Sequence, residues 1–108
     1  MLIFHSLSAV TIELPTDVEY PLAGTDLVLT CKTSDSTFTK YAFYKGAMVL
    51  AALSANNTHT VANPTSGGND GDYHCIAADD SDKQSAETPK LNIAFKSKSF
   101  LIHHLKDK

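Results

Sequence analysis

Three aspartates, Asp79, Asp80 and Asp82, form a short cluster of potential cation ligands. Calcium takes roughly six to eight oxygen ligands from a shaped loop. This run lacks both the glycine and the terminal glutamate of an EF-hand loop. We therefore predict a solvated hairpin tip without a bound metal. The three carboxylates remain candidates for contact with a protein partner, because exposed loops often carry recognition.

The histidines do not form a zinc-binding pattern. Zinc sites use closely spaced pairs of cysteine and histidine. Here only one pair of histidines is adjacent, and neighbours on a strand face opposite sides. The histidine positions are His5, His59, His74, His103 and His104. The sequence therefore predicts no metal centre.

No sequence pattern places serine, histidine or aspartate as a catalytic group. The chain contains no nucleophile elbow, no glycine-rich phosphate loop and no metal-binding helix motif. We therefore expect no enzymatic activity and no cofactor. A hydrolase is the competing hypothesis, and it requires a pocket with converging polar groups.

The cysteines allow one intramolecular pair. A bond between Cys31 and Cys75 would close a loop of roughly 45 residues, worth about 4 kcal/mol in the chain-entropy model. A disulfide implies an oxidising compartment, whereas two reduced thiols imply an intracellular protein. The spacing of the two cysteines leaves both states open.

A possible modification site lies on a predicted polar turn. Asn56-Asn57-Thr58 is an N-glycosylation sequon, whereas the similar run at Asn63 is blocked by Pro64. A glycan on Asn56 would indicate an extracellular protein.

The composition predicts one small acidic domain. The chain has 108 residues, a formal net charge of −3 and 43% apolar residues, which is enough for one core. The first 95 residues are acidic, so nucleic acid is not expected as a partner. No stretch approaches the ~20 apolar residues of a membrane-spanning helix.

Both ends of the chain lie outside the predicted domain. Residues 1–9 form a lead-in whose apolar start is compatible with a signal-peptide remnant but is too short for a full signal peptide. Residues 96–108 carry several lysines and form a basic linker or tail.

Alternating apolar and polar residues predict the strands that must position these groups. Leu27, Leu29 and Cys31 form the clearest alternation, with the cysteine facing inward. Residues 10–14 predict an edge strand that Pro15 ends, since proline has no amide to donate. Further alternating strands are predicted over residues 18–20, 41–45, 59–61, 72–77 and 91–95, and the continuous apolar run over residues 48–53 predicts another short strand.

The run over residues 69–75 anchors the placement of the other strands. Gly71 precedes a strand where the chain turns sharply, and Tyr73 can bury its ring while its hydroxyl bonds to backbone. The run resembles the tyrosine-corner segment of the immunoglobulin superfamily, whose usual pattern is Asp-x-Gly-x-Tyr-x-Cys. Asn69 stands where that pattern has aspartate.

A second resemblance to this superfamily lies in residues 43–46, Phe-Tyr-Lys-Gly. They are similar to the Trp-Tyr-Lys-x-Gly segment of the family's third strand, shortened by one residue, with Phe43 at the tryptophan position. We expect Tyr41 or Leu50 to fill the volume that the smaller ring leaves. His59 stands at an inward position where the family generally has leucine.

The resemblance covers residues 10–95 and implies an all-β fold. The expected structure is a two-sheet antiparallel immunoglobulin-like sandwich of C2 or I type, with seven to eight strands. The cysteine spacing leaves no room for the additional hairpin of a variable-type domain. The implied structural residues are Leu29, Phe43, Gly71 and Tyr73, around a disulfide between Cys31 and Cys75.

The resemblance also implies a function: a non-catalytic, extracellular protein-recognition module of a receptor, adhesion or secreted immune-type protein, similar to leukocyte and Fc-receptor-like domains. Its partner would be a protein bound through a sheet face or hairpin loops, with homophilic or dimeric association also compatible. Candidate contact residues are Tyr44 and Met48, together with the three aspartates, whereas Leu50 is expected to pack within the sheet. The alternative is an intracellular structural domain of a muscle or cytoskeletal filament protein with reduced cysteines.

Overall fold

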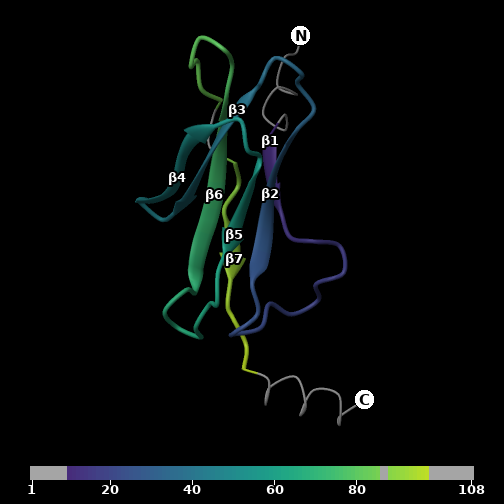
Figure 1. The fold of residues 1–108 in the computed structure, drawn as a ribbon, viewed down its shortest axis with the longest axis vertical. Coiled ribbons are helices and arrows are strands. Elements are labelled where there is room, and N and C mark those ends of the chain that lie inside the picture. The colour runs from purple at the N-terminus through teal and green to yellow at the C-terminus, as the bar shows by residue number, and fades with distance from the viewer. Residues whose placement is uncertain (1–9, 86–87, 98–108) are drawn as a thin grey trace.

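The computed structural model describes residues 10–85 and 88–97, which form seven β-strands (Figure 1). The strands are β1 (Val10–Glu13), β2 (Leu27–Thr33), β3 (Lys40–Lys45), β4 (Met48–Ser54), β5 (Thr58–Val61), β6 (Gly71–Ala78) and β7 (Leu91–Ile93). The predicted lead-in and most of the predicted tail lie outside the described residues. Within the described ranges, no helix is long and apolar enough to cross a membrane.

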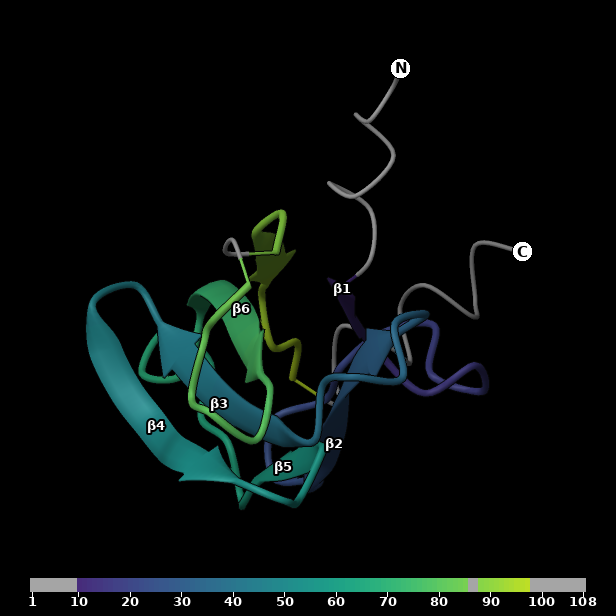
Figure 2. The same cartoon turned by 90° about the horizontal axis from the view of Figure 1, so that it is seen from above.

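The strands form two antiparallel sheets that pack face to face. One sheet has three strands in the order β1-β2-β5, and the other has four in the order β4-β3-β6-β7. Figure 2, viewed from above, shows these two layers. The structure therefore confirms the predicted two-sheet antiparallel sandwich, with seven strands.

The core lies between the inner faces of the two sheets. In β2, Leu27, Leu29 and Cys31 are buried, whereas Val28 between them is 40% exposed. This is the alternation expected of a strand with one buried face. The core also contains Val10, Ile12, Phe43, Val61, Tyr73, Cys75, Ala77, Ile93 and Phe95. Burial of these side chains is the main favourable contribution to folding.

The predicted strand over residues 18–20 is wrong. The amide of Val18 donates to the carbonyl of Pro15 at 3.1 Å, which closes a turn and takes the chain away from the sheet. The chain returns to the sandwich at Leu22, which forms an isolated parallel bridge with Lys96. Lys96, assigned to the tail from the sequence, is therefore tied to the body of the sandwich.

The last strand is shorter than predicted, because the last of its predicted residues, Phe95, bonds through its amide to the side chain of Asp70 and not to the backbone of β6. β7 ends at Ile93 rather than at residue 95. Phe95 is still 1% exposed, and its amide donates to a carboxylate oxygen of Asp70 at 2.8 Å. The strands β1, β3, β4, β5 and β6 begin and end within one residue of their predicted bounds.

Candidate recognition surface

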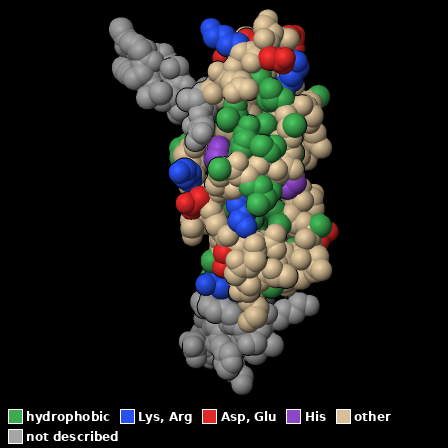
Figure 3. Space-filling model, turned by 90° about the vertical axis from the view of Figure 1, so that its left-hand side faces the viewer, with side chains coloured by type: hydrophobic (Ala, Val, Ile, Leu, Met, Phe, Trp, Pro, Cys, Tyr) green, Lys and Arg blue, Asp and Glu red, His purple; other side chains and the backbone are tan. Residues whose placement is uncertain are grey.

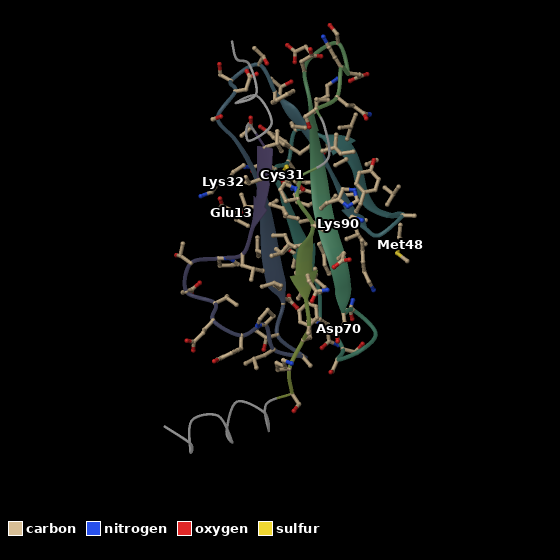
Figure 4. All side chains as sticks on the ribbon, turned by 180° about the vertical axis from the view of Figure 1, so that it is seen from behind. Glu13, Cys31, Lys32, Met48, Asp70 and Lys90 are labelled. Atoms are coloured by element: carbon tan, nitrogen blue, oxygen red, sulfur yellow. A yellow bond between two sulfur atoms is a disulfide. The ribbon has the colours of Figure 1, made fainter. Side chains whose placement is uncertain are left out.

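The predicted disulfide between Cys31 and Cys75 is present and joins the two sheets. Cys31 lies on β2 and Cys75 on β6, with their Cα atoms 6.1 Å apart and both side chains fully buried. Figure 4 shows Cys31 inside the sandwich. The two cysteines are 44 residues apart in sequence, so the bond stabilises the fold by about 4 kcal/mol in the chain-entropy model. The pair is a structural crosslink.

Phe43 lies beside this disulfide on the neighbouring strand, at the position that the resemblance gives to tryptophan. It pairs with Cys75 in the β3–β6 register and is 1% exposed. Its ring stacks on the ring of His59, with centroids 5.7 Å apart. Burial lowers the pKa of His59 below its usual value. Tyr41 and Leu50 also pack against the core.

Tyr73 and the turn before it have the geometry of a tyrosine corner. The ring of Tyr73 is 1% exposed, and its hydroxyl donates to the carbonyl of Asn69. Burial raises the pKa of the Tyr73 hydroxyl, with a smaller contribution from the nearby charge of Asp70. At Gly71, where φ is 155°, a Cβ would lie 3.0 Å from the Lys45 side chain. The glycine therefore lets Lys45 cross over the start of β6.

Asn69 uses its side-chain oxygen where the family pattern has an aspartate. That oxygen accepts a hydrogen bond from the amide of Thr65 at 2.7 Å and one from the Thr65 hydroxyl at 3.2 Å. An amide oxygen and a carboxylate oxygen are both acceptors, so either residue can satisfy this turn. The neighbouring Asp70 holds Phe95, as described above.

The outer face of the four-stranded sheet carries a stacked aromatic pair. Tyr44 on β3 and His74 on β6 are directly opposite each other, with ring centroids 4.9 Å apart and ring planes within 6° of parallel. His74 is 5% exposed and Tyr44 is half-buried. The stack fixes both side chains against the sheet.

Exposed apolar side chains lie next to this pair on β4, the edge strand of the sheet. Met48 is 60% exposed and Val49 is 56% exposed, whereas Leu50 packs against the core. Figure 3, which faces the β4 side of the molecule, shows apolar side chains gathered along the middle of this face. In Figure 4, Met48 projects outward from the end of the β3–β4 hairpin. We call Met48–Ser54 the β4 edge.

The three aspartates lie in the loop after β6 and bond to groups of the protein. One carboxylate oxygen of Asp79 accepts the amides of Ser81 and Lys83, each at 2.9 Å. Asp80 accepts the hydroxyl of Thr39, and Asp82 pairs with Lys40; both distances are 2.6 Å. The hydrogen bond to Asp82 raises the pKa of Lys40. Among the residues described, no group of three or more His, Cys, Asp or Glu side chains is arranged to hold a metal ion.

This acidic loop (residues 79–83) and the β4 edge meet at one end of the molecule. A shallow hollow of about 450 Å³ lies between them. It is lined by Thr39, Lys40, Leu53, Ser54, Ala55, Asp80 and Asp82. The apolar strand edge and the acidic loop therefore form one continuous surface.

Asn56 lies in the exposed turn between β4 and β5. Its side-chain oxygen accepts both the amide of Thr58, at 3.0 Å, and the Thr58 hydroxyl, at 2.9 Å. The first and third residues of the sequon, Asn56 and Thr58, therefore face each other on the surface.

Sequence reasoning missed Val49 as an exposed residue. The run from residue 48 to 53 is apolar throughout, so no alternation distinguishes its inner side chains from its outer ones. Sequence reasoning also missed that Asp70 accepts a hydrogen bond from the amide of Phe95. The two residues are far apart in the sequence, and only the path of the folded chain brings them together.

Among the solved structures that resemble this chain are two with low sequence identity. The second Ig-C2 domain of human Fc-receptor like A matches with a TM-score of 0.67 and 20% identity, covering 82% of this chain and 96% of that chain. Fibronectin(III)-like modules of CbhA from Clostridium thermocellum match with a TM-score of 0.65 and 21% identity, covering 81% and 94%. The sequence matches no protein-family model and no curated protein. Together with the two sheets and their central disulfide, these matches show that the chain has the immunoglobulin-like sandwich fold.

Proposed function

We propose that this chain is a non-catalytic, extracellular protein-recognition module of a cell-surface receptor, an adhesion protein or a secreted immune-type protein. The module is the predicted domain of residues 10–95 together with Lys96, which bridges to Leu22. Its contact surface is the β4 edge, the stacked pair of Tyr44 and His74 beside it, and the acidic loop at its end.

The observation that carries this proposal is the exposure of Met48 and Val49 beside a fixed aromatic pair. Protein interfaces are enriched in tyrosine and methionine at their centres and are polar at their rims. Tyr44 is already held in place by its stack on His74, so little side-chain freedom is lost when a partner binds. The acidic loop provides the polar rim.

The disulfide and the sequon support an extracellular location. Disulfides persist in oxidising compartments and are rare in the cytosol. Asn56 lies exposed in a turn, as an N-glycosylation site must. The likeness to an Ig-C2 domain of human Fc-receptor like A adds an argument from fold alone, and such folds are generally non-catalytic.

Recognition is tested by displaying the chain as a tetramer, which raises avidity for a weakly bound surface protein. A fluorescent tetramer of the 108-residue chain is incubated with intact cells of the source organism. We expect staining that falls at least about tenfold when Tyr44→Ala and Met48→Ala are combined. The control is Val28→Ala, at an exposed valine of the other sheet. Staining that is absent, or that survives the double variant, contradicts recognition through this surface.

The location is tested on protein isolated from its native source. We expect a glycan on Asn56 by peptide mass spectrometry and no free thiol on Cys31 or Cys75 in a denaturing thiol assay. Two titratable thiols would instead support the alternative, an intracellular structural domain of a filament protein.

A further inference from the structure

Within residues 10–85 and 88–97, the two sheets have four edge strands, and three of them are protected against pairing with another chain. β1, β5 and β7 are four, four and three residues long. A proline lies within three residues of each: Pro15, Pro64 and Pro89. Short strands and nearby prolines are the usual means of preventing edge-to-edge association.

β4 lacks these protections. It is seven residues long, and the stretch Ala47–Ala55 contains no charged residue and no proline. In the described part of the sheet β4 pairs with β3 alone. The other side of β4 therefore presents the unpaired backbone groups of an edge strand. The exposed side chains of Met48 and Val49 lie at the first end of this strand.

The charges at the two ends of the β4 edge identify a fitting occupant. At its start, Met48 pairs with Lys45, whose ammonium group donates to the carbonyl of Gly68. At its end, Ser54 lines a hollow together with Lys40, Asp80 and Asp82; Lys40 pairs with Asp82, which leaves the charge of Asp80 without a cationic partner in the hollow. One end is therefore basic and the other acidic.

We infer that the β4 edge binds the β4 edge of a second copy of this chain, with the two strands antiparallel and centred on Ala52, which faces Ala52 of the other copy. Two-fold symmetry then places the Lys45 end of each copy next to the Asp80 end of the other. The small central side chains let the two backbones approach. In this register Val49 faces Ala55 and Leu50 faces Ser54, so that a larger side chain meets a smaller one along the contact.

The curvature of β4 limits the length of this pairing. The register between β3 and β4 shifts twice, and the additional residues are on β4. Bulges of this kind increase the local twist of a strand. Both shifts lie between Val49 and Ser54, so the second strand forms only a short, twisted ladder there, while Met48 and Val49 supply further contact through their side chains.

This inference rests on the proposed function, because it names the partner of the same surface. Sedimentation velocity on the purified full chain, at concentrations up to roughly 1 mM, detects even a weak dimer. We expect a monomer–dimer equilibrium that shifts at least about tenfold toward monomer in Val49→Lys. The matched control Val28→Lys, at an exposed valine on β2, leaves the equilibrium unchanged. A wild-type chain that stays monomeric overturns the inference, as does a dimer that survives Val49→Lys or is equally weakened by Val28→Lys.

Two further experiments test the antiparallel arrangement. Lys45→Glu is expected to weaken the dimer at least about tenfold, and adding Asp80→Lys is expected to restore it, because the charges at the two ends are exchanged. Ala52→Cys is expected to form a disulfide-linked dimer under mild oxidation, whereas Val28→Cys is not. Failure of both the rescue and the crosslink overturns the arrangement. A monomeric chain whose β4 edge binds a different protein overturns the inference and leaves the proposed function standing.

Discussion

His59 is a titratable residue placed where its charged form is unfavourable. It lies on β5 directly opposite Leu29, stacks on Phe43 and has a pKa lowered by burial. The folded chain therefore binds this proton less readily than the unfolded chain, in which the pKa is near the usual 6.5. Stability is retained above that value and falls as the pH drops through it toward the lower pKa of the folded state.

We predict that His59→Leu removes this acid sensitivity. Urea denaturation at pH 8, 6 and 5 should show a free energy of unfolding that falls with pH in the wild type and falls less in the variant. Thr60→Leu is the matched control, because Thr60 is exposed on the same strand. An identical fall in His59→Leu and in the wild type would contradict the assignment.

Tyr73 provides a second prediction at the residue scale. Tyr73→Phe removes the hydroxyl that bonds to the carbonyl of Asn69, which should lower the free energy of unfolding by about 1–2 kcal/mol. Tyr41→Phe is the control, because the Tyr41 hydroxyl makes only a long contact of 3.4 Å with the Phe38 carbonyl. An equal decrease in the free energy of unfolding in the two variants would contradict a stabilising role for the hydrogen bond from Tyr73 to Asn69.

The raised pKa of Tyr73 also predicts its alkaline behaviour. Burial keeps the hydroxyl protonated in the folded state, while the unfolded chain loses the proton near the usual pKa of 10.0. Stability is therefore present below that pH and falls above it. Between pH 9 and pH 11, the free energy of unfolding measured by urea denaturation should decrease less in Tyr73→Phe than in the wild type.

At the scale of elements, a single side chain replaces the last part of the β6–β7 pairing. Asp70→Ala removes the acceptor of the Phe95 amide and should lower the free energy of unfolding by about 1–2 kcal/mol. Hydrogen exchange followed by NMR should show lost protection of the Phe95 amide. Asp72→Ala is the control, because Asp72 is exposed and bonds to the side chain of Asn92. Retained protection in Asp70→Ala would contradict this account.

The elements differ in how well the sequence predicts them. β2 follows from the alternation of Leu27, Val28 and Leu29, since one face is buried and the other is solvated. The segment around Val18 shows the same alternation, but the turn at Pro15 prevents it from pairing. Local patterns report which side chains prefer burial, whereas the path of the backbone decides whether a partner strand is within reach.

The candidate surface was predictable in part. Tyr44 and Met48 were identified from their place near the third and fourth strands. The stack of Tyr44 on His74 depends on register between strands about 30 residues apart in sequence, which no local pattern records. The exposure of Val49 was not predictable, because an apolar run gives the same signal for a buried strand and for an exposed edge.

At the scale of the whole molecule, the disulfide is expected to account for a large share of the stability. Replacing Cys31 and Cys75 together by alanine should lower the free energy of unfolding by about 4 kcal/mol. For a domain of this size, calorimetry should show a melting temperature lower by roughly 15 °C or more. Reductant should shift the wild type in the same direction and leave the double variant unchanged. A wild type that is fully reduced without any shift would contradict the prediction.

The crosslink also determines how the molecule responds to force. A chain pulled at residues 10 and 97 transmits tension through the bond between Cys31 and Cys75, so the segment between them does not extend. Their sequence separation of 44 residues corresponds to roughly 150 Å of extended chain. In single-molecule stretching, the oxidised protein should therefore lengthen by that much less than the reduced protein when it unfolds. A series of such modules joined end to end would, for the same reason, gain less length under force while its disulfides are intact.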